Sequence, residues 1–495
     1  MEEIKNDTKS YRSILKATSI FGGVQIWKIL LGMVNQKFIA ILIGTEGMGI
    51  TGLYNSGLQF IQGITAMGLS QSAVKNVAEA NSTGDKKRVG VVVSSLRMIV
   101  WLTGLLGAVS VIVLSPWLSK TSFGNYDYAL PFALLSVTLL LNQLSVGQSV
   151  VLQGLRKIRY LAKAGLFGSL LGLVTTVPIY YFFRIQGIVP TIIIHSATTL
   201  LLTWYFSRKV EITKVSITWN QAFHEGKEMM KMGIALSFNS MMVLGVVYIT
   251  RVFIGKWGGI EQVGLYVAGT AIVNTYAGLV FSAMSTDYYP RLASYGSDNN
   301  KCSQCINQQA EIGVLLLTPI LLFFLLLVPF MVVILYSEDF LPVVGFMQWA
   351  LLGTMFKTIS WAISFVFIAK GAMKPFLINE ILIKAFHVPA YLLGYYEWGL
   401  NGLGVAFVLN YILYTVIVYF VAHRLYGFKF SNSLIKLFSV EFMLVSFSFA
   451  AIHFSYTYKY VVCVPILAIC IIFTFIEVKK RTSFQLKNFV AKLSK

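Results

Sequence analysis

Positively charged side chains inside apolar stretches are the residues in this sequence most able to do chemistry. Lys28, Arg251 and Lys357 each lie within a long run of apolar residues. A cation at the centre of a membrane-spanning helix costs about 2.5–3.5 kcal/mol, so it usually faces water or a partner. The alternative is that the side chain reaches the lipid headgroups from near a helix end. For Arg251 the two interpretations are evenly matched, whereas for Lys28 a role in a water-filled cavity is favoured. We expect all three to line a substrate pathway.

Amide side chains form a second polar set. Asn55, Gln59 and Gln62 lie on one face of an expected helix, and Asn274 occupies the position that corresponds to Gln62 in a later stretch. Amides suit sugar hydroxyls, but they equally suit hydrogen bonds between helices, each worth about 1 kcal/mol. The second interpretation is preferred for any single residue, whereas the four together predict a polar substrate pathway.

Two pairs of opposite charge have helical spacing. Glu380 and Lys384 stand four residues apart in the order that favours an ion pair. They form either a pair that neutralises itself or a protonatable site for ion coupling, and the sequence leaves both open. Asp287 and Arg291 could form a gate at the cytoplasmic end of a helix, although Pro290 between them disturbs the regular geometry.

The sequence shows no pattern typical of catalysis or metal binding. Cys302 and Cys305 form a single C-x-x-C without a second pair of ligands nearby, so no metal site is expected. The nucleotide-binding motif G-x-x-x-x-G-K-[ST] does not occur. The connections between apolar stretches are too short for the catalytic loops of a membrane-embedded glycosyltransferase. We therefore expect neither an enzyme nor a cofactor.

The composition requires lipid around most of this chain. Hydrophobic residues make up 56% of the 495, the mean hydropathy is +0.72, and 12% are charged, against about 25% in soluble domains. A membrane-spanning helix needs about 20 mainly apolar residues. We therefore predict an all-α polytopic membrane protein with about fourteen transmembrane helices. The predicted helices are 17–43, 47–72, 89–114, 128–152, 160–183, 187–206, 232–254, 262–287, 309–335, 343–369, 375–396, 401–423, 436–455 and 459–477.

The distribution of basic residues sets the expected orientation. The net charge is +20, but Lys and Arg lie in short connections rather than on one face, which argues against nucleic-acid binding. Counted in alternate connections, they number 30 in one set and four in the other. This positive-inside pattern predicts a multi-pass membrane protein with both termini in the cytoplasm, where anionic lipids are expected partners.

Two halves of the chain resemble one another. GITGLY at 49–54 matches EQVGLY at 261–266, and TAMGLSQSAVKNVAE at 65–79 parallels SAMSTDYYPRLASYG at 282–296. Each copy begins on the same predicted side, so we expect two six-helix lobes related by pseudo-two-fold symmetry, plus two C-terminal helices. The expected domains are an N-terminal lobe at 1–206, a cytoplasmic connection at 207–231, a C-terminal lobe at 232–425, and the last two helices with a basic tail at 426–495.

The charge inside the expected helices is mostly positive, which predicts an anionic substrate headgroup such as a diphosphate. A multidrug exporter would carry an acidic cavity, and the first six expected helices hold no clearly buried Asp or Glu. The residues therefore favour a carrier of anions over an exporter of cations.

Two motifs add a family resemblance. VAEANSTGDKKRVG at 77–90 and STDYYPRLAS at 285–294 resemble Wzx-type polysaccharide flippases, of the multidrug/oligosaccharidyl-lipid/polysaccharide exporter superfamily, over residues 10–425. The resemblance implies a two-lobed bundle that moves an undecaprenyl-diphosphate-linked oligosaccharide, an O-antigen-like repeat unit, to the periplasmic leaflet by alternating access. It also implies ion-gradient coupling and, as partners, the polymerase and chain-length proteins of the same pathway. The alternatives are a multidrug exporter or a lipid II exporter of that superfamily.

Overall fold

The computed structural model describes residues 2–213, 215–296, 298–454 and 459–482. Within these ranges every regular element is a helix, which confirms the all-α prediction. The part of the predicted basic tail beyond residue 482 lies outside the described residues. The elements are α1 Glu2–Thr65, α2 Leu69–Ser82, α3 Lys86–Phe123, α4 Ala129–Gly154, α5 Ile158–Phe183, η1 Arg184–Gly187, α6 Ile188–Arg208, α7 Trp219–Gly258, α8 Ile260–Ser294, α9 Asn299–Leu335, η2 Glu338–Val343, α10 Val344–Ala369, α11 Met373–Tyr426, α12 Asn432–Phe454 and α13 Lys459–Thr482.

Eleven helical stretches in the described ranges are long and apolar enough to cross a membrane. Three of them contain a break, at Gly44 in α1, at Arg184–Gly187 between α5 and α6, and at Trp398–Gly399 in α11. Gly44 and Gly399 have φ values of 64° and 57°, in the left-handed region that glycine adopts without strain. The eleven stretches therefore supply fourteen passes, and each break lies at or beside a gap predicted from the sequence.

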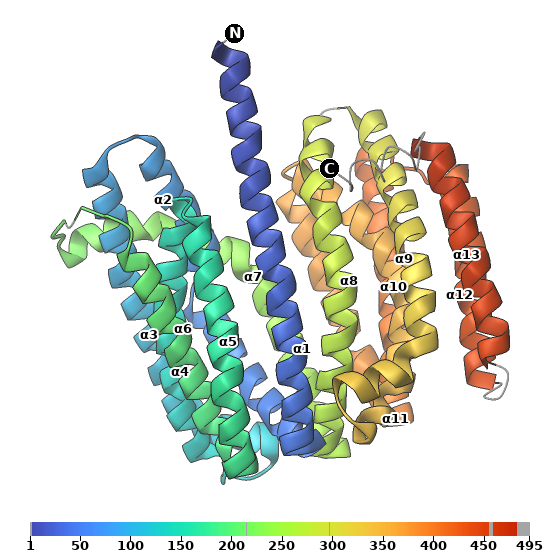
Figure 1. Ribbon diagram of the computed structural model, residues 1–495, viewed down its shortest axis with the longest axis horizontal. Coiled ribbons are helices and arrows are strands. Elements are labelled where there is room, and N and C mark those ends of the chain that lie inside the picture. The colour runs from blue at the N-terminus through green and yellow to red at the C-terminus, as the bar shows by residue number, and fades with distance from the viewer. Residues whose placement is uncertain (1, 214, 297, 455–458, 483–495) are drawn as a thin grey trace. The chain divides into compact units, whose positions relative to one another are not determined.

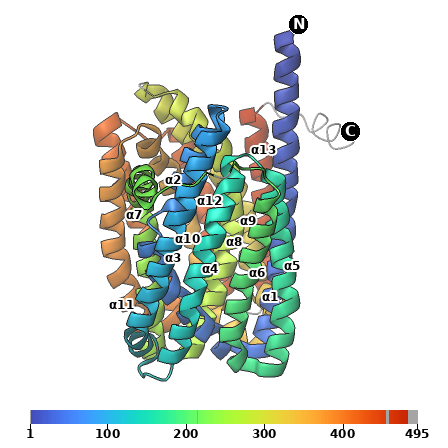
Figure 2. The same ribbon diagram turned by 90° about the vertical axis from the view of Figure 1, so that its left-hand side faces the viewer.

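The described chain divides into two compact units. Unit 1 comprises Met1–Gly264 together with Leu335–Ser337, and unit 2 comprises Leu265–Ile334 and Glu338–Lys495. In unit 1, α3, α4, α6 and α5 lie side by side in that order, and α1 contacts α5 (Figures 1 and 2). The α7 helix packs against α1, α2 and α3. Unit 1 therefore holds all the helices that surround the pocket described below.

The two sequence repeats meet inside unit 1 at close-packed glycines. A Cβ atom at Gly49 in α1 would lie 2.0 Å from the carbonyl oxygen of Ile260. A Cβ atom at Gly264 in α8 would lie 1.9 Å from the carbonyl oxygen of Thr45. Because no side-chain carbon fits at those distances, the two helices can touch through their backbones only with glycine at both positions.

The connection between α6 and α7 is fastened to α3. The Ser94 hydroxyl donates a hydrogen bond to the Val215 carbonyl oxygen at 3.2 Å. The Arg88 guanidinium donates two hydrogen bonds to the Glu225 carboxylate, at 2.5 and 2.8 Å. Because α7 begins within it, the polar connection expected at 207–231 is helical over its second half.

In unit 2, α12 packs on α10 through aromatic rings. The ring centroids of Trp349 and Phe449 are 4.5 Å apart. Phe356 lies 5.5 Å from Phe438 and 5.2 Å from Phe442. Such ring pairs contribute about 0.5–1.5 kcal/mol each beyond their buried area, so they hold α12 against the centre of α10.

Candidate functional site

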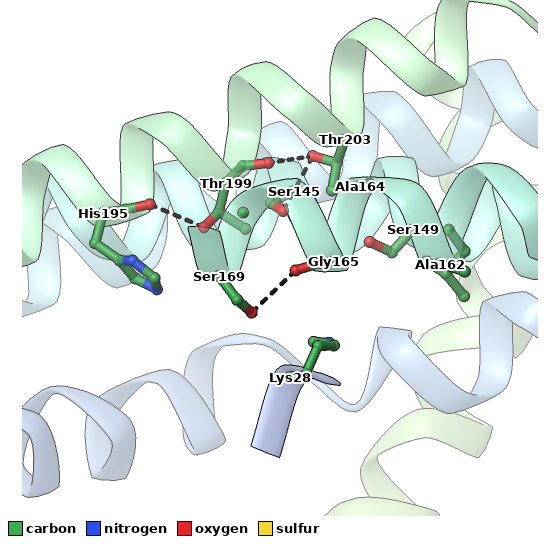
Figure 3. A pocket seen from close by; sticks show the side chains of 12 residues that line it. Lys28, Ser145, Ser149, Ala162, Ala164, Gly165, Ser169, His195, Thr199 and Thr203 are labelled. Atoms are coloured by element: carbon green, nitrogen blue, oxygen red, sulfur yellow. Dashed lines mark hydrogen bonds between the residues drawn. The ribbon is translucent and has the colours of Figure 1, made fainter. Parts of the chain in front are cut away.

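A pocket of about 420 Å³ lies among α1, α4, α5 and α6 of unit 1 (Figure 3). One lysine, one histidine, five hydroxyl-bearing residues and several small residues form its wall. The lining residues are Lys28, Ser145, Ser149, Leu161, Ala162, Ala164, Gly165, Gly168, Ser169, His195, Thr199 and Thr203.

Glycines on α5 make room for the two basic side chains. Lys28 extends from α1 toward α5, and a Cβ atom at Gly165 would lie 2.9 Å from its ammonium nitrogen (Figure 3). A Cβ atom at Gly172 would lie 2.9 Å from Nδ1 of His195. Both distances are shorter than an ordinary contact, so each glycine leaves the space that one basic group occupies.

Three of the five hydroxyl groups that line the pocket donate a hydrogen bond within their own helix. Ser169 donates to the Gly165 carbonyl oxygen at 3.0 Å, and Thr199 donates to that of His195 at 2.8 Å. Thr203 lies 2.9 Å from the Thr199 carbonyl oxygen and 3.1 Å from the Ser145 hydroxyl. A hydroxyl that donates within its own helix keeps oxygen lone pairs for a ligand. The wall therefore accepts hydrogen bonds, as sugar hydroxyls require.

The pocket carries positive charge without compensation from its wall. No Asp or Glu belongs to the lining residues. Among the described residues, Lys28 has neither an ion-pair partner nor a hydrogen-bond acceptor. A buried ammonium group without a partner is costly. An anionic ligand would offset that cost, so the pocket suits an anion that bears hydroxyl groups.

The other predicted pathway residues of unit 1 do not line this pocket. Arg251 on α7 donates a hydrogen bond to the Gly52 carbonyl oxygen in α1 at 2.9 Å. Asn55 and Gln62 are half-buried in the second pass of α1, and Gln59 is exposed. The structure thus shows a bracing contact for Arg251 and gathers only Lys28 into the pocket.

Lys357 lies in unit 2, near the middle of α10. Its ammonium nitrogen is 5.6 Å from the centroid of the Phe281 ring on α8 and 5.5 Å from that of Tyr411 on α11. No acidic side chain of the described residues pairs with it. Aromatic faces attract a cation by about 0.5–2 kcal/mol each, which offsets part of the burial cost. The Lys357 ammonium group therefore lies between two rings and is available to an anion.

The predicted pair of Glu380 and Lys384 forms on α11, with 3.5 Å between the ammonium nitrogen and the nearer carboxylate oxygen. Glu380 is 7% exposed and also accepts a hydrogen bond from the Tyr414 hydroxyl at 2.5 Å. The neighbouring amides of Asn379 and Asn410 are buried, and some of their polar atoms have no hydrogen-bond partner. This cluster joins the two passes of α11 and contains buried polar atoms without a hydrogen-bond partner.

Asp287 and Arg291 are paired within α8, with 3.6 Å between the carboxylate oxygen and the guanidinium nitrogen. The helix continues through Pro290, so the proline does not prevent the i,i+4 contact. Arg291 also donates a hydrogen bond to Gln309 on α9 at 2.9 Å, while the Asp287 side chain is 82% exposed. Asn274, on the same helix, is exposed.

Sequence reasoning missed His195 and the hydroxyl residues of the pocket. Their spacing could have revealed them, because they stand four residues apart within one expected helix. A stripe at i,i+4 marks one helix face. The two stripes are Ser145 with Ser149, and His195 with Thr199 and Thr203.

The comparison with protein families decides the wider assignment. A family model described as polysaccharide biosynthesis protein matches residues 38–345, which is well over half of the chain. This chain belongs to that family. The Lipid III flippase of Escherichia coli strain K12 is 20% identical to this member of the polysaccharide biosynthesis family over 423 residues, which cover 81% of this chain and 96% of the flippase.

Solved structures show the same fold for this polysaccharide biosynthesis protein. The Lipid II flippase MurJ in an inward closed conformation has a TM-score of 0.68 at 13% identity, covering 93% of this chain and 98% of MurJ. An inward-facing MATE family multidrug transporter of the MOP superfamily has a TM-score of 0.66 at 16% identity, covering 83% and 96%. These likenesses confirm the expected superfamily fold, and the relatives are described as flippases and transporters rather than enzymes.

Proposed function

We propose that this polysaccharide biosynthesis protein is a flippase for an undecaprenyl-diphosphate-linked oligosaccharide, an O-antigen-like repeat unit. It moves this lipid from the cytoplasmic to the periplasmic leaflet of a bacterial inner membrane by alternating access. The chemical task is to carry a charged diphosphate and its sugars past the hydrocarbon core while the polyprenyl tail stays in lipid.

The unit 1 pocket is the observation that supports this proposal. Lys28 has no acidic partner among the described side chains, and the surrounding wall presents hydroxyl oxygens. A phosphate oxygen accepts a charge-assisted hydrogen bond from an ammonium group, which is roughly twice as strong as a neutral one. Sugar hydroxyls donate to the lone pairs of the wall. Lys357 between its two rings supplies a second cation in unit 2.

A multidrug exporter of the same superfamily is the runner-up. A pocket for organic cations would need a carboxylate, and none of the described residues that line the pocket in unit 1 carries one. A lipid II exporter would use the same charge chemistry as our proposal. The family description, polysaccharide biosynthesis, favours an oligosaccharide intermediate over lipid II.

Ion coupling would use the Glu380 cluster. Lys384 and the Tyr414 hydroxyl hold the carboxylate in a buried position. Uptake of a proton would break the ion pair, and the unpartnered atoms of Asn379 could then take up the released contacts. We infer that this change in charge couples the ion gradient to the passage of substrate.

The remaining elements of the proposal follow from the sequence. Both termini are cytoplasmic, and the six-helix lobes are 1–206 and 232–425. Anionic lipids contact the cytoplasmic face, and the exposed pair of Asp287 and Arg291 acts as a gate there. The polymerase and chain-length proteins of the pathway are partners. Further residues proposed for the substrate pathway are Arg251, Asn55, Gln59, Gln62 and Asn274.

The decisive experiment replaces the pocket cation. We expect Lys28→Ala to abolish transport of the lipid-linked oligosaccharide into the periplasmic leaflet, measured as surface glycan in a strain that lacks the chromosomal gene. Lys28→Arg should retain part of the transport because it keeps the charge. Lys163→Ala removes an exposed lysine from α5, the helix that faces Lys28, and should behave like the wild type.

Protein abundance in the membrane is measured for each variant, so a folding defect is separated from a transport defect. Full surface glycan with Lys28→Ala at normal abundance would refute a role for this cation. Loss of glycan with Lys163→Ala as well would show that any loss of positive charge on these helices is harmful. The effect of Lys28→Ala would then not support a substrate site in the pocket.

A further inference from the structure

A carboxylic acid lies completely buried in the pair of helices α12 and α13, and it belongs to none of the residue sets described above. Glu441 on α12 is 0% exposed. It accepts a weak hydrogen bond from the Cys470 thiol at 3.3 Å and one from the Thr474 hydroxyl at 3.4 Å, both on α13. None of the ion pairs among the described residues includes it. A buried carboxylate without a cation is strongly unfavourable, so the carboxyl either holds a proton or is accompanied by a cation.

A proline in α9 supplies an acceptor at the same place. Pro319 has no N–H, so the carbonyl of Leu315, four residues earlier, lacks its intrahelical donor. That carbonyl oxygen lies 3.4 Å from the Thr474 hydroxyl. The freed carbonyl on α9 and the carboxylate on α12 thus converge on one hydroxyl of α13. Freed backbone carbonyls beside acidic groups bind cations in the membrane-spanning parts of transporters.

With Glu441 ionised, the available protons cannot satisfy this cluster. Thr474 has one hydroxyl proton, but both Glu441 and the Leu315 carbonyl oxygen need a donor from it. The Cys470 thiol is a weak donor. A cation shared by the oxygen atoms would satisfy all of them at once.

The spacing of the oxygen atoms also fits a small cation. Hydroxyl hydrogen bonds are usually about 2.7–2.8 Å long, and both contacts of Thr474 measure 3.4 Å. Oxygen ligands at right angles around a cation with bonds of about 2.4 Å stand roughly 3.4 Å apart. One carboxylate balances one positive charge, whereas a divalent cation would leave a buried excess.

We propose that Glu441, Thr474 and the Leu315 carbonyl form a binding site for a monovalent cation, Na⁺. The site joins α9, α12 and α13, and it supplies four oxygen atoms if both carboxylate oxygens bind. It is independent of the flippase proposal, since it requires only that the full-length protein binds Na⁺.

The test uses the purified full-length protein in lipid nanodiscs. Saturable binding of radioactive ²²Na⁺ is measured, and thermal unfolding is compared in NaCl and in choline chloride at equal ionic strength. We expect Glu441→Gln, which keeps the size of the side chain, to weaken Na⁺ binding by about tenfold or more. The melting temperature of this variant should no longer depend on Na⁺.

Two prolines of α9 give a matched comparison. Pro319→Ala restores the N–H that bonds to the Leu315 carbonyl, so we expect Na⁺ binding to weaken severalfold with the carboxylate intact. Pro329→Ala makes the same change ten residues further along the helix, where it frees no atom of this site, and should bind Na⁺ as the wild type does. Glu380→Gln should also leave the Glu441 site intact.

Three results would overturn the proposal. The first is the absence of saturable Na⁺ binding to the wild type. The second is unchanged binding by Glu441→Gln and Pro319→Ala, particularly if Glu380→Gln abolishes it, because the cation would then bind in the α11 cluster. The third is a melting temperature that does not depend on Na⁺ but falls as the pH rises from 6 to 9. If that fall disappears in Glu441→Gln, the carboxyl holds a proton rather than a cation.

Discussion

Adding one methyl group to the pocket should separate stability from transport. A Cβ atom at Gly165 would lie 2.9 Å from Nζ and 3.3 Å from Cε of Lys28. The flexible end of the lysine can retreat by about 1 Å, so Gly165→Ala should not unfold the protein. Alanine also favours a helix over glycine by about 1 kcal/mol. We therefore expect equal or higher thermal stability together with weaker transport.

The size of the transport defect follows from the displacement of charge. At an effective dielectric constant of 20, an ammonium and a phosphate charge attract by about 4 kcal/mol at 4 Å and about 3.3 kcal/mol at 5 Å. A retreat of about 1 Å thus costs about 0.8 kcal/mol, or roughly fourfold in affinity. Removal of the whole charge in Lys28→Ala would cost up to several hundredfold.

Gly168→Ala is the matched control for this prediction. Gly168 lines the same pocket one turn along α5, and the only atom near an added Cβ is Leu202 Cδ1 at 3.8 Å. It gains the same helix propensity without touching Lys28. Transport is measured as surface glycan, or as the rate of flipping in proteoliposomes, and stability as the melting temperature. Equal transport by the two alanine variants would refute the reasoning that Lys28 contacts the substrate.

Three further predictions concern single contacts. Lys357→Ala should abolish transport without loss of expression, whereas Lys357→Arg should keep part of it; full complementation by the alanine variant would show that the charge is dispensable. Tyr414→Phe removes the hydrogen bond to the buried Glu380 carboxylate and should lower stability by about 1–3 kcal/mol, measured by chemical or thermal unfolding in detergent, and an unchanged midpoint would contradict it. The Arg88 guanidinium lowers the pKa of Glu225 below its ordinary value of 4.5, so the pair contributes fully at neutral pH and loses its contribution as the pH falls through the lowered pKa. Glu225→Gln should therefore lower the melting temperature at pH 7 by the equivalent of about 1 kcal/mol or less and have no effect once the pH is below the lowered pKa of Glu225. A difference of the same size at both pH values would exclude this electrostatic origin.

The passes through the membrane were predictable because lipid sets their length and composition. Each pass must present about 20 mainly apolar residues, and Gly44 and Gly399 mark turns that few other residues could make. The ion pair of Glu380 and Lys384 was predictable too, because both residues lie on one helix and their spacing alone brings them together.

The faces that meet between helices were not predictable in the same way. In a membrane protein, both the lipid-facing and the packed surfaces are apolar, so hydrophobic periodicity does not tell them apart. Lys28 was predicted to line a pathway, but its neighbours in the pocket come from α4, α5 and α6, which the spacing within its own helix does not reveal. The role of Pro319 depends likewise on α12 and α13 lying beside α9, which single-helix spacing does not reveal.

The three tight breaks limit how the chain can rearrange. Within α11, a Cβ atom at Gly394 would lie 2.5 Å from the Gly402 carbonyl oxygen, so the two arms touch directly on either side of the turn. Such joined arms should insert into the membrane together as one hairpin and move as one body. An epitope tag inserted at Gly44 or Gly399 would push the two arms of the hairpin apart. A tag in the connection at 209–213 would interrupt no hairpin. Topology reporters and crosslinkers for this protein are therefore best designed around hairpins rather than single helices.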